Sequence, residues 1–124
     1  MSPLASTLFY VGAALMLLDA VLYSLGAIRP IRARVKAPNV YWDRRLLLNL
    51  LLANMELYFT ALFTLIGASL SRTTPGAAQP MLVLSIVVCL YSGVSVLLLT
   101  PRDWPHTLPR VLAAVLIGIG LLIR

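Results

Sequence analysis

The chain has 124 residues with a formal net charge of +6, and 60% of the residues are hydrophobic while only 11% are charged. A soluble domain has about 45–50% apolar and about 25% charged residues, so this composition excludes one and predicts a single membrane-embedded domain over residues 1–124. The lone cysteine, Cys89, excludes an intramolecular disulfide and a cysteine-based metal site, and we expect no metal and no cofactor.

Four apolar segments follow one another along the chain, at about 8–28, 46–70, 81–99 and 108–123. A helix that crosses a bilayer needs about 20 apolar residues, with a range of about 17–25, and the first three segments reach that length. The last is shorter, about 24 Å at 1.5 Å per residue, but it ends at Arg124, whose long side chain can reach the interface. The pattern predicts an all-α integral membrane protein with four transmembrane helices in an up-down-up-down bundle.

The basic residues are distributed unevenly between the predicted loops. Six of the ten lie in the first loop or at its edge: Arg29, Arg32, Arg34, Lys36, Arg44 and Arg45. Arg102 and Arg110 flank the third loop. Cytoplasmic loops carry such an excess, so we expect both termini outside the cytoplasm, and we read the positive charge as topology rather than as a nucleic-acid surface. The preference for Arg over Lys suggests a GC-rich bacterial genome, and for a multi-pass protein of such a source we expect the bacterial inner membrane.

Part of the basic first loop is a candidate site for lipid headgroups. Arg44 and Arg45 open the second apolar segment, and Arg34 lies earlier in the loop. A basic residue near the surface attracts anionic lipid by about 1 kcal/mol. We therefore expect membrane lipids as partners, with simple interfacial anchoring as the alternative role for these arginines.

Two of the four acidic residues lie inside apolar segments. Glu56 is in the middle of the second segment, on a helical stripe with Asn49 and Thr60, and Asn54 lies on its flank. A carboxylate at bilayer depth costs a few kcal/mol, so such a group is usually paired, protonated or facing a polar cavity. Glu56 is therefore the strongest functional candidate.

Asp19 is the second buried acid and shares a stripe with Tyr23 in the first segment. We expect Asp19 and Glu56 at similar depth near mid-bilayer, where two close carboxylates would share a proton or hold a cationic or polar ligand. In the structural alternative, both are protonated and join helices by hydrogen bonds. The predicted ligand- or proton-binding residues are Asp19, Tyr23, Asn49, Asn54, Glu56 and Thr60.

No catalytic residue is predicted. His106 lies in the third loop, where we expect it to be solvated or interfacial. The serines of the third segment have no histidine at the same depth, so a serine nucleophile is not supported.

In layout the chain resembles small four-helix enzymes of the MAPEG type, which use glutathione. The likeness is carried by the basic first loop and by Asn49, Asn54 and Glu56 early in the second segment. The MAPEG motif has Asn and Glu three positions apart and a following Pro, whereas Asn54 and Glu56 are two apart and the segment has no Pro. Small multidrug transporters and EXPERA-type sterol-binding proteins share only the size and the membrane acids, so we assign no family.

The favoured function is the binding or transport of a small lipophilic or cationic ligand, or of protons, through a mid-membrane acidic pocket. The alternatives are an accessory subunit of a larger membrane complex, indicated by Gly12, Gly26, Gly118 and Gly120, and a MAPEG-like or lipid-modifying enzyme. Because a bundle of this size has a small interior, we also expect a homo-oligomer or a larger membrane complex.

Overall fold

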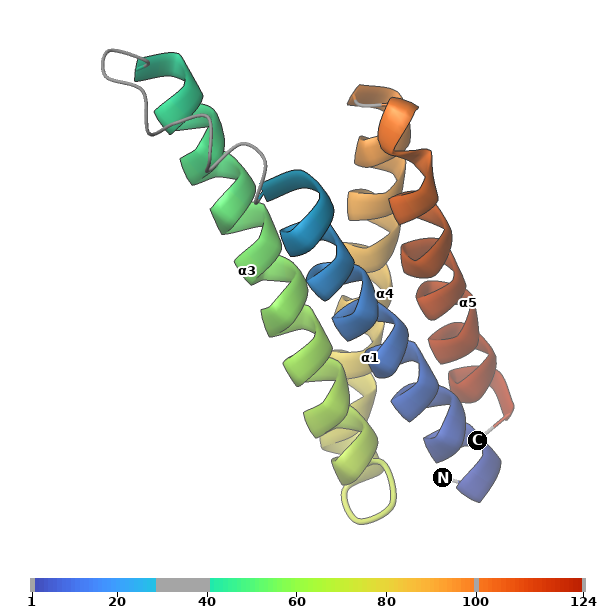
Figure 1. The fold of residues 1–124 in the computed structure, drawn as a ribbon. Coiled ribbons are helices and arrows are strands. Elements are labelled where there is room, and N and C mark those ends of the chain that lie inside the picture. The colour runs from blue at the N-terminus through green and yellow to red at the C-terminus, as the bar shows by residue number, and fades with distance from the viewer. Residues whose placement is uncertain (1, 29–40, 100, 124) are drawn as a thin grey trace.

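The computed structural model of the chain describes residues 2–28, 41–99 and 101–123, and all of its regular structure is helical. The elements in chain order are α1 (Pro3–Tyr23), the π-helix η1 (Ser24–Ile28), α3 (Tyr41–Leu70), α4 (Pro75–Leu99), the 3-10 helix η2 (Pro101–His106) and α5 (Thr107–Ile123) (Figure 1). Four stretches are long and apolar enough to cross a membrane: Pro3–Gly26, Leu51–Leu70, Pro75–Leu98 and Trp104–Ile123. The predicted all-α class with four helices of spanning length is therefore confirmed. Arg34 and the side chains of Arg44 and Arg45 lie outside the described residues.

Three long helices begin several residues earlier than the apolar pattern predicts, and one of them is α3, which begins at Tyr41 rather than at about residue 46. Helix α1 begins at Pro3, because Ser2 caps it by accepting a hydrogen bond from the Ala5 amide at 3.2 Å. Helix α4 begins at Pro75 rather than at Met81, after Thr74, whose carbonyl accepts from the amides of Ala77 and Ala78. Proline suits the first helical position because its missing N–H would have no partner there.

Pro80, which directly precedes the apolar segment predicted from Met81, lies within α4 rather than at its start. Proline inside a helix removes one backbone hydrogen bond. In an α-helix the amide of residue 80 would donate to the carbonyl of Gly76, and proline has no amide hydrogen. Both Pro80 and Gly76 are exposed, so the unbonded carbonyl of Gly76 does not lie in the core.

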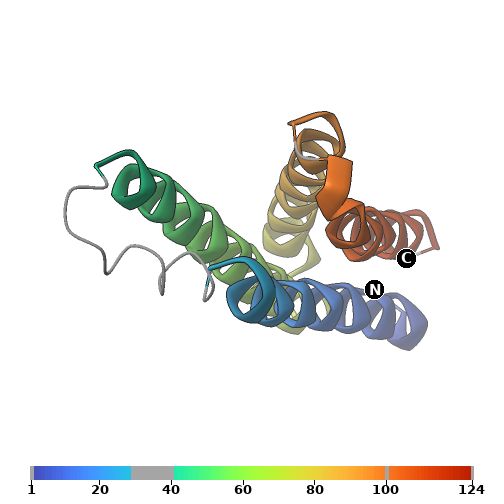
Figure 2. The ribbon, with the colours of Figure 1, turned by 45° about the horizontal axis from the view of Figure 1, so that its top comes forward.

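Each long helix packs against two others. Helix α1 contacts α3 and α5, and α4 also contacts α3 and α5. The turn that joins α3 to α4 lies at the same end of the molecule as both termini, and η2 lies at the opposite end (Figure 1). Helices α3 and α4 meet near their shared turn and diverge toward the η2 end in both views (Figures 1 and 2).

Glycines allow α1 and α5 to approach closely. A Cβ atom added to Gly120 would lie 2.5 Å from Cε1 of Phe9, and one added to Gly12 would lie 2.8 Å from Cγ1 of Ile117. Small residues bring helix backbones together in the same way in membrane proteins. Gly12 and Gly120 therefore lie in the contact between α1 and α5, where a side chain would not fit. A Cβ atom added to Gly26 would meet nothing within 4 Å.

Large apolar side chains cover the outer faces of the helices. Leu98 is 72% exposed, Leu122 is 87% exposed and Phe59 is 62% exposed. Soluble monomers rarely expose contiguous apolar surface on this scale. The interior holds smaller side chains, including Ala20, Ala61 and Ala113.

Candidate functional site

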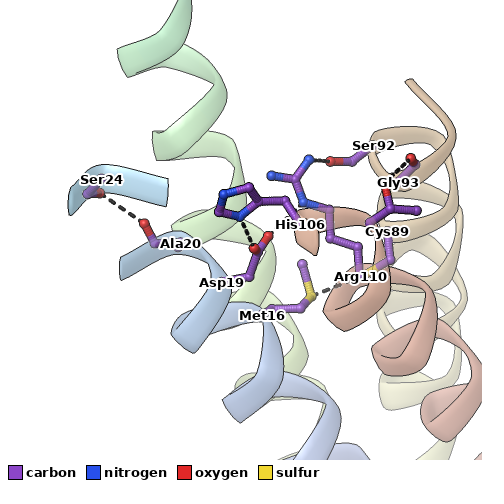
Figure 3. Close-up of polar contacts among 10 residues, drawn as sticks. Met16, Asp19, Ala20, Ser24, Cys89, Ser92, Gly93, His106 and Arg110 are labelled. Atoms are coloured by element: carbon purple, nitrogen blue, oxygen red, sulfur yellow. Dashed lines mark hydrogen bonds and ion pairs between the residues drawn. The ribbon is translucent and has the colours of Figure 1, made fainter. Parts of the chain in front are cut away.

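A buried ion-pair cluster joins the first helix to the last. The Asp19 side chain is 1% exposed, and its Oδ2 accepts from Nε of Arg110 at 2.7 Å. Its Oδ1 lies 2.7 Å from Nδ1 of His106. Nη1 of Arg110 in turn donates to Oγ of Ser92 on α4, also at 2.7 Å (Figure 3). One carboxylate and one guanidinium thus connect α1, η2, α4 and α5.

Tyr23 lies one helical turn after Asp19 and completes this cluster. Its ring meets the His106 ring edge to face, with the centroids 5.3 Å apart and the planes at 89°. Cζ of Arg110 lies 5.7 Å from the centroid of the Tyr23 ring. A guanidinium at that distance from an aromatic ring is attracted by the ring's quadrupole. Tyr23, predicted as a site residue, therefore faces the cationic side of the cluster.

Arg110 and His106 are functional candidates that were expected from the sequence to lie at the membrane interface, outside the site. Arg110 was interpreted as an interfacial cation beside the third loop, but its side chain is 5% exposed. His106 was expected to be solvated or interfacial; its side chain is 20% exposed and bonded to Asp19. A sequence signal existed, because Arg110 lies inside the last apolar segment and a charge there needs an opposite partner such as Asp19.

Glu56 lies in a different setting from Asp19. It is on the exposed side of α3, and its carboxylate has no hydrogen bond or ion pair with any residue that the structure describes. Both oxygens of Asp19 are already bonded to Arg110 and His106. Within the described ranges the two predicted acids are therefore not joined by a hydrogen bond, and Glu56 remains the acid available to another molecule.

The other predicted residues on α3 have separate roles. Asn54 is buried and its Nδ2 donates to Oγ of Ser24 at 2.6 Å, which ties α3 to η1. The hydroxyl of Thr60 donates to the backbone carbonyl of Glu56 at 2.7 Å. Asn49 is exposed. None of these three side chains is bonded to Asp19 or to the Glu56 carboxylate among the described contacts.

Two hollows meet at Glu56. The first, which we call the apolar groove, has a volume of about 450 Å³ and runs between α3 and α4. Most of its lining is apolar, including Met55, Phe59 and Ile66, with the hydroxyls of Thr60 and Ser85 at its base. Such a groove can bind an alkyl chain or an aromatic ring through apolar contacts alone.

The second hollow, which we call the polar cleft, has a volume of about 310 Å³. It opens where α3 and α4 diverge, and side chains from all four long helices line it. Its polar residues are Tyr23, Glu56, Ser92, Ser95 and Arg110. Glu56 and Val88 line both hollows. The two together form a path with a polar end and an apolar end, and Glu56 lies at the junction.

The charged groups all lie between the middle of their apolar stretches and the stretch ends on the η2 side of the molecule. Asp19, Glu56 and Arg110 are each within about two helical turns, or about 10 Å, of the stretch ends at Gly26, Leu51 and Trp104. The polar cleft therefore opens toward the η2 end of the molecule, and the apolar groove extends toward the turn between α3 and α4.

The described side chains around the two hollows offer ionic and hydrogen-bond recognition. No group of three His, Cys, Asp or Glu residues in the described part of the chain could hold a metal ion. An enzymatic role near the interface would need a general base. His106 is bonded to Asp19, and the side chains of Asp43 and Asp103 lie outside the described residues. In comparisons with known proteins, no protein-family model, curated protein or solved structure matches this chain.

Proposed function

We propose that this chain is a membrane protein that binds a small amphipathic ligand, with the cationic group of the ligand on Glu56 and its apolar body in the apolar groove. The four helices would cross the bilayer in up-down-up-down order. The uneven distribution of basic residues supports termini outside the cytoplasm of a bacterial inner membrane. Transport of the same ligand, or of protons, would use the same carboxylate.

The observation that carries the proposal is the carboxylate of Glu56, which has no partner among the described residues and lies where the two hollows meet. An acidic side chain within an apolar helix is costly and is usually found where it serves a ligand, an ion or a proton pathway. Asp19, the other acid at this depth, is neutralised by Arg110. A ligand cation would give Glu56 the partner that the described residues do not supply.

The shape of the hollows supports an amphipathic ligand over a bare inorganic cation. Ligand pockets in proteins commonly measure about 300–1,000 Å³ and are mostly apolar with a few polar groups, and both hollows fit that description. A bare cation would leave the apolar groove without a role. An alkylammonium compound would place its charge on Glu56 and its chain against Phe59 and Ile66.

The Asp19–Arg110 ion pair has a supporting role in this proposal. By linking α1, α4 and α5 it fixes the walls of the polar cleft on three helices. Glu56, on α3, then faces a preorganised surface, which lowers the ordering that a ligand must impose when it binds.

The test is a titration with octyltrimethylammonium of protein in dodecyl maltoside, an uncharged detergent. The methyl group of Met55, which lines the apolar groove, reports binding by NMR, and Met16, buried elsewhere in the core, serves as an internal control. We expect saturable binding that Glu56→Gln weakens by about tenfold to a hundredfold, because the neutral amide loses the Coulomb attraction between the carboxylate and the quaternary ammonium, and about 1.4 kcal/mol of that attraction corresponds to a factor of ten. Glu56→Asp should retain part of the affinity. Equal binding to the wild type and Glu56→Gln would overturn the proposal.

A further inference from the structure

We infer that the ligand of this site is zwitterionic and that its anionic group binds Arg110 while its cationic group binds Glu56. The inference rests on the proposed function and adds the second half of the ligand's headgroup. Two observations support the inference: Arg110 has N–H donors without a partner among the described residues, and charges of both signs line or adjoin the polar cleft.

Arg110 has donors left over after its bonds within the protein. A guanidinium carries five N–H donors in a planar fork. Nε donates to Asp19 and one hydrogen of Nη1 is directed to Ser92. Nη2 has no partner among the residues that the structure describes, although the side chain is only 5% exposed and lines the polar cleft. This edge of Arg110 is not sealed from the cleft, because the buried side-chain polar atom that lacks a partner among the described residues is Oδ1 of Asn54. Nη2 is therefore open to an acceptor on a bound molecule.

The geometry of the guanidinium fits an anion in the cleft. In Figure 3, Nη1 is directed to Ser92, and the remaining nitrogen lies on the side of the guanidinium away from Ser92. The Ser92 hydroxyl accepts from Arg110, and its own hydrogen has no acceptor within the described residues. Phosphate and carboxylate oxygens accept two donors of this kind in parallel, which is the arrangement that arginine recognises best.

The charges around the cleft select against ligands of a single sign. A ligand with only an anionic group would have Arg110 as its partner, but it would lie beside Glu56 and near Asp19. A ligand with only a cationic group would bind Glu56 but would face Arg110 across the same cleft. Opposite charges attract and like charges repel strongly in a low-dielectric site. A zwitterion places each of its charges against the opposite one.

The chemical class is therefore an amphiphile whose headgroup joins an ammonium group to a phosphate or a carboxylate. The polar cleft, about 310 Å³, accommodates the headgroup, and the apolar groove, about 450 Å³, accommodates the chain. A membrane lipid and a free headgroup compound share this chemistry. The experiment separates them by comparing a ligand that has a chain with one that lacks it.

The experiment uses four probes with the full chain in dodecyl maltoside and the Met55 methyl signal as readout. Octylphosphocholine carries both charges, octyltrimethylammonium only the cation, octyl phosphate only the anion, and glycerophosphocholine has the headgroup without the chain. We expect octylphosphocholine to bind at least about tenfold more tightly than either singly charged octyl probe, as one added charge-assisted pair implies. Weaker binding of glycerophosphocholine would assign the site to a chain-bearing lipid, and equal binding would assign it to a free headgroup compound.

Two variants complete the design. Arg110→Lys keeps a positive charge beside Asp19 but loses the fork, so it should remove the preference for octylphosphocholine over octyltrimethylammonium. Arg72→Lys makes the same exchange at an exposed position in the turn between α3 and α4 and should change neither affinity. If Arg110→Lys does not fold, the comparison of probes on the wild type still decides the matter.

The results distinguish failure of this inference from failure of the proposed function. If octyltrimethylammonium and octylphosphocholine bind equally and Glu56→Gln weakens both, the cation site stands and the zwitterion inference is overturned. If no octyl probe binds more tightly to the wild type than to Glu56→Gln, the proposed function fails and the inference fails with it.

Discussion

Nε of Arg110 and Oδ2 of Asp19 lie 2.7 Å apart in the interior, and this contact joins the last helix to the first. The same carboxylate lies 2.7 Å from Nδ1 of His106, and the same guanidinium reaches Ser92. The ion pair is thus the centre of a network that spans three of the four long helices. Its loss would affect both the stability of the bundle and the walls of the polar cleft.

We predict that Asp19→Ala destabilises the folded protein by about 3–5 kcal/mol, because it leaves the Arg110 charge buried without its partner. Urea or SDS unfolding in mild detergent measures this change. The double variant Asp19→Leu with Arg110→Met should lose less than Asp19→Ala alone, since it removes both charges together. A larger loss in the double variant would contradict the assignment of the cost to an unpaired charge.

The hydrogen on His106 should reside on Nδ1. Both oxygens of an ionised Asp19 only accept hydrogen bonds, so Nδ1 must donate across the 2.7 Å contact. His106 is the chain's single histidine, so ¹⁵N NMR of the imidazole reads this tautomer without assignment work. A resonance pattern with an unprotonated Nδ1 would show that the contact is not made in this form.

His106→Phe tests how much the hydrogen bond between His106 and Asp19 stabilises the folded protein. The aromatic ring retains its packing against Tyr23 but loses the donor to Asp19. We expect a loss of about 1–3 kcal/mol in unfolding free energy, the range for a hydrogen bond to a charged group. His106→Asn, which keeps a donor on a shorter side chain, should lose less than His106→Phe, and the reverse order would argue against this contact.

Gly120→Ala should destabilise the bundle by about 1–3 kcal/mol, the usual cost of overpacking. The added Cβ would lie 2.5 Å from Cε1 of Phe9 and 3.2 Å from the carbonyl oxygen of Ala5, so α1 and α5 would have to move apart. Gly118→Ala is the matched control on the same helix, because its nearest neighbour would be 4.0 Å away. Equal effects of the two variants on unfolding would contradict the close packing.

Membrane crossing predicts that the two ends of the molecule face opposite sides of the bilayer. Thr73 lies in the turn between α3 and α4, and Trp104 lies in η2; both are exposed. In a Cys89→Ala background, a single cysteine at either position should react with an impermeant maleimide from one side only, and the two positions should react from different sides. Labelling of both from the same side would rule out the up-down-up-down order.

The apolar segments were predictable because hydropathy depends only on local composition. The residues at which the helices begin were less predictable. The first turns of helix α4 contain Pro75, Gly76 and Gln79, which carry no apolar signal, and Pro80 lies within the helix rather than at its start. Capping by Ser2 likewise extends α1 beyond the apolar run.

For the candidate site, the sequence identified the acids but not their partners. Asp19 and Glu56 were found because a carboxylate in an apolar run is conspicuous. Which of them meets Arg110 depends on how α1, α3 and α5 rotate and pack, and helical periodicity does not define that packing. Arg110 was attributed to an interface because it follows a loop, yet the start of α5 directs it inward to Asp19.

The location of a bound cation tests the central claim most directly. Intermolecular NOEs from the trimethylammonium protons of bound octyltrimethylammonium should reach the methyl groups of Val88, which lines both hollows beside Glu56. They should vanish in Glu56→Gln at the same ligand concentration. NOEs confined to outer side chains such as Leu98 and Leu122, and unchanged in Glu56→Gln, would contradict a ligand site at Glu56.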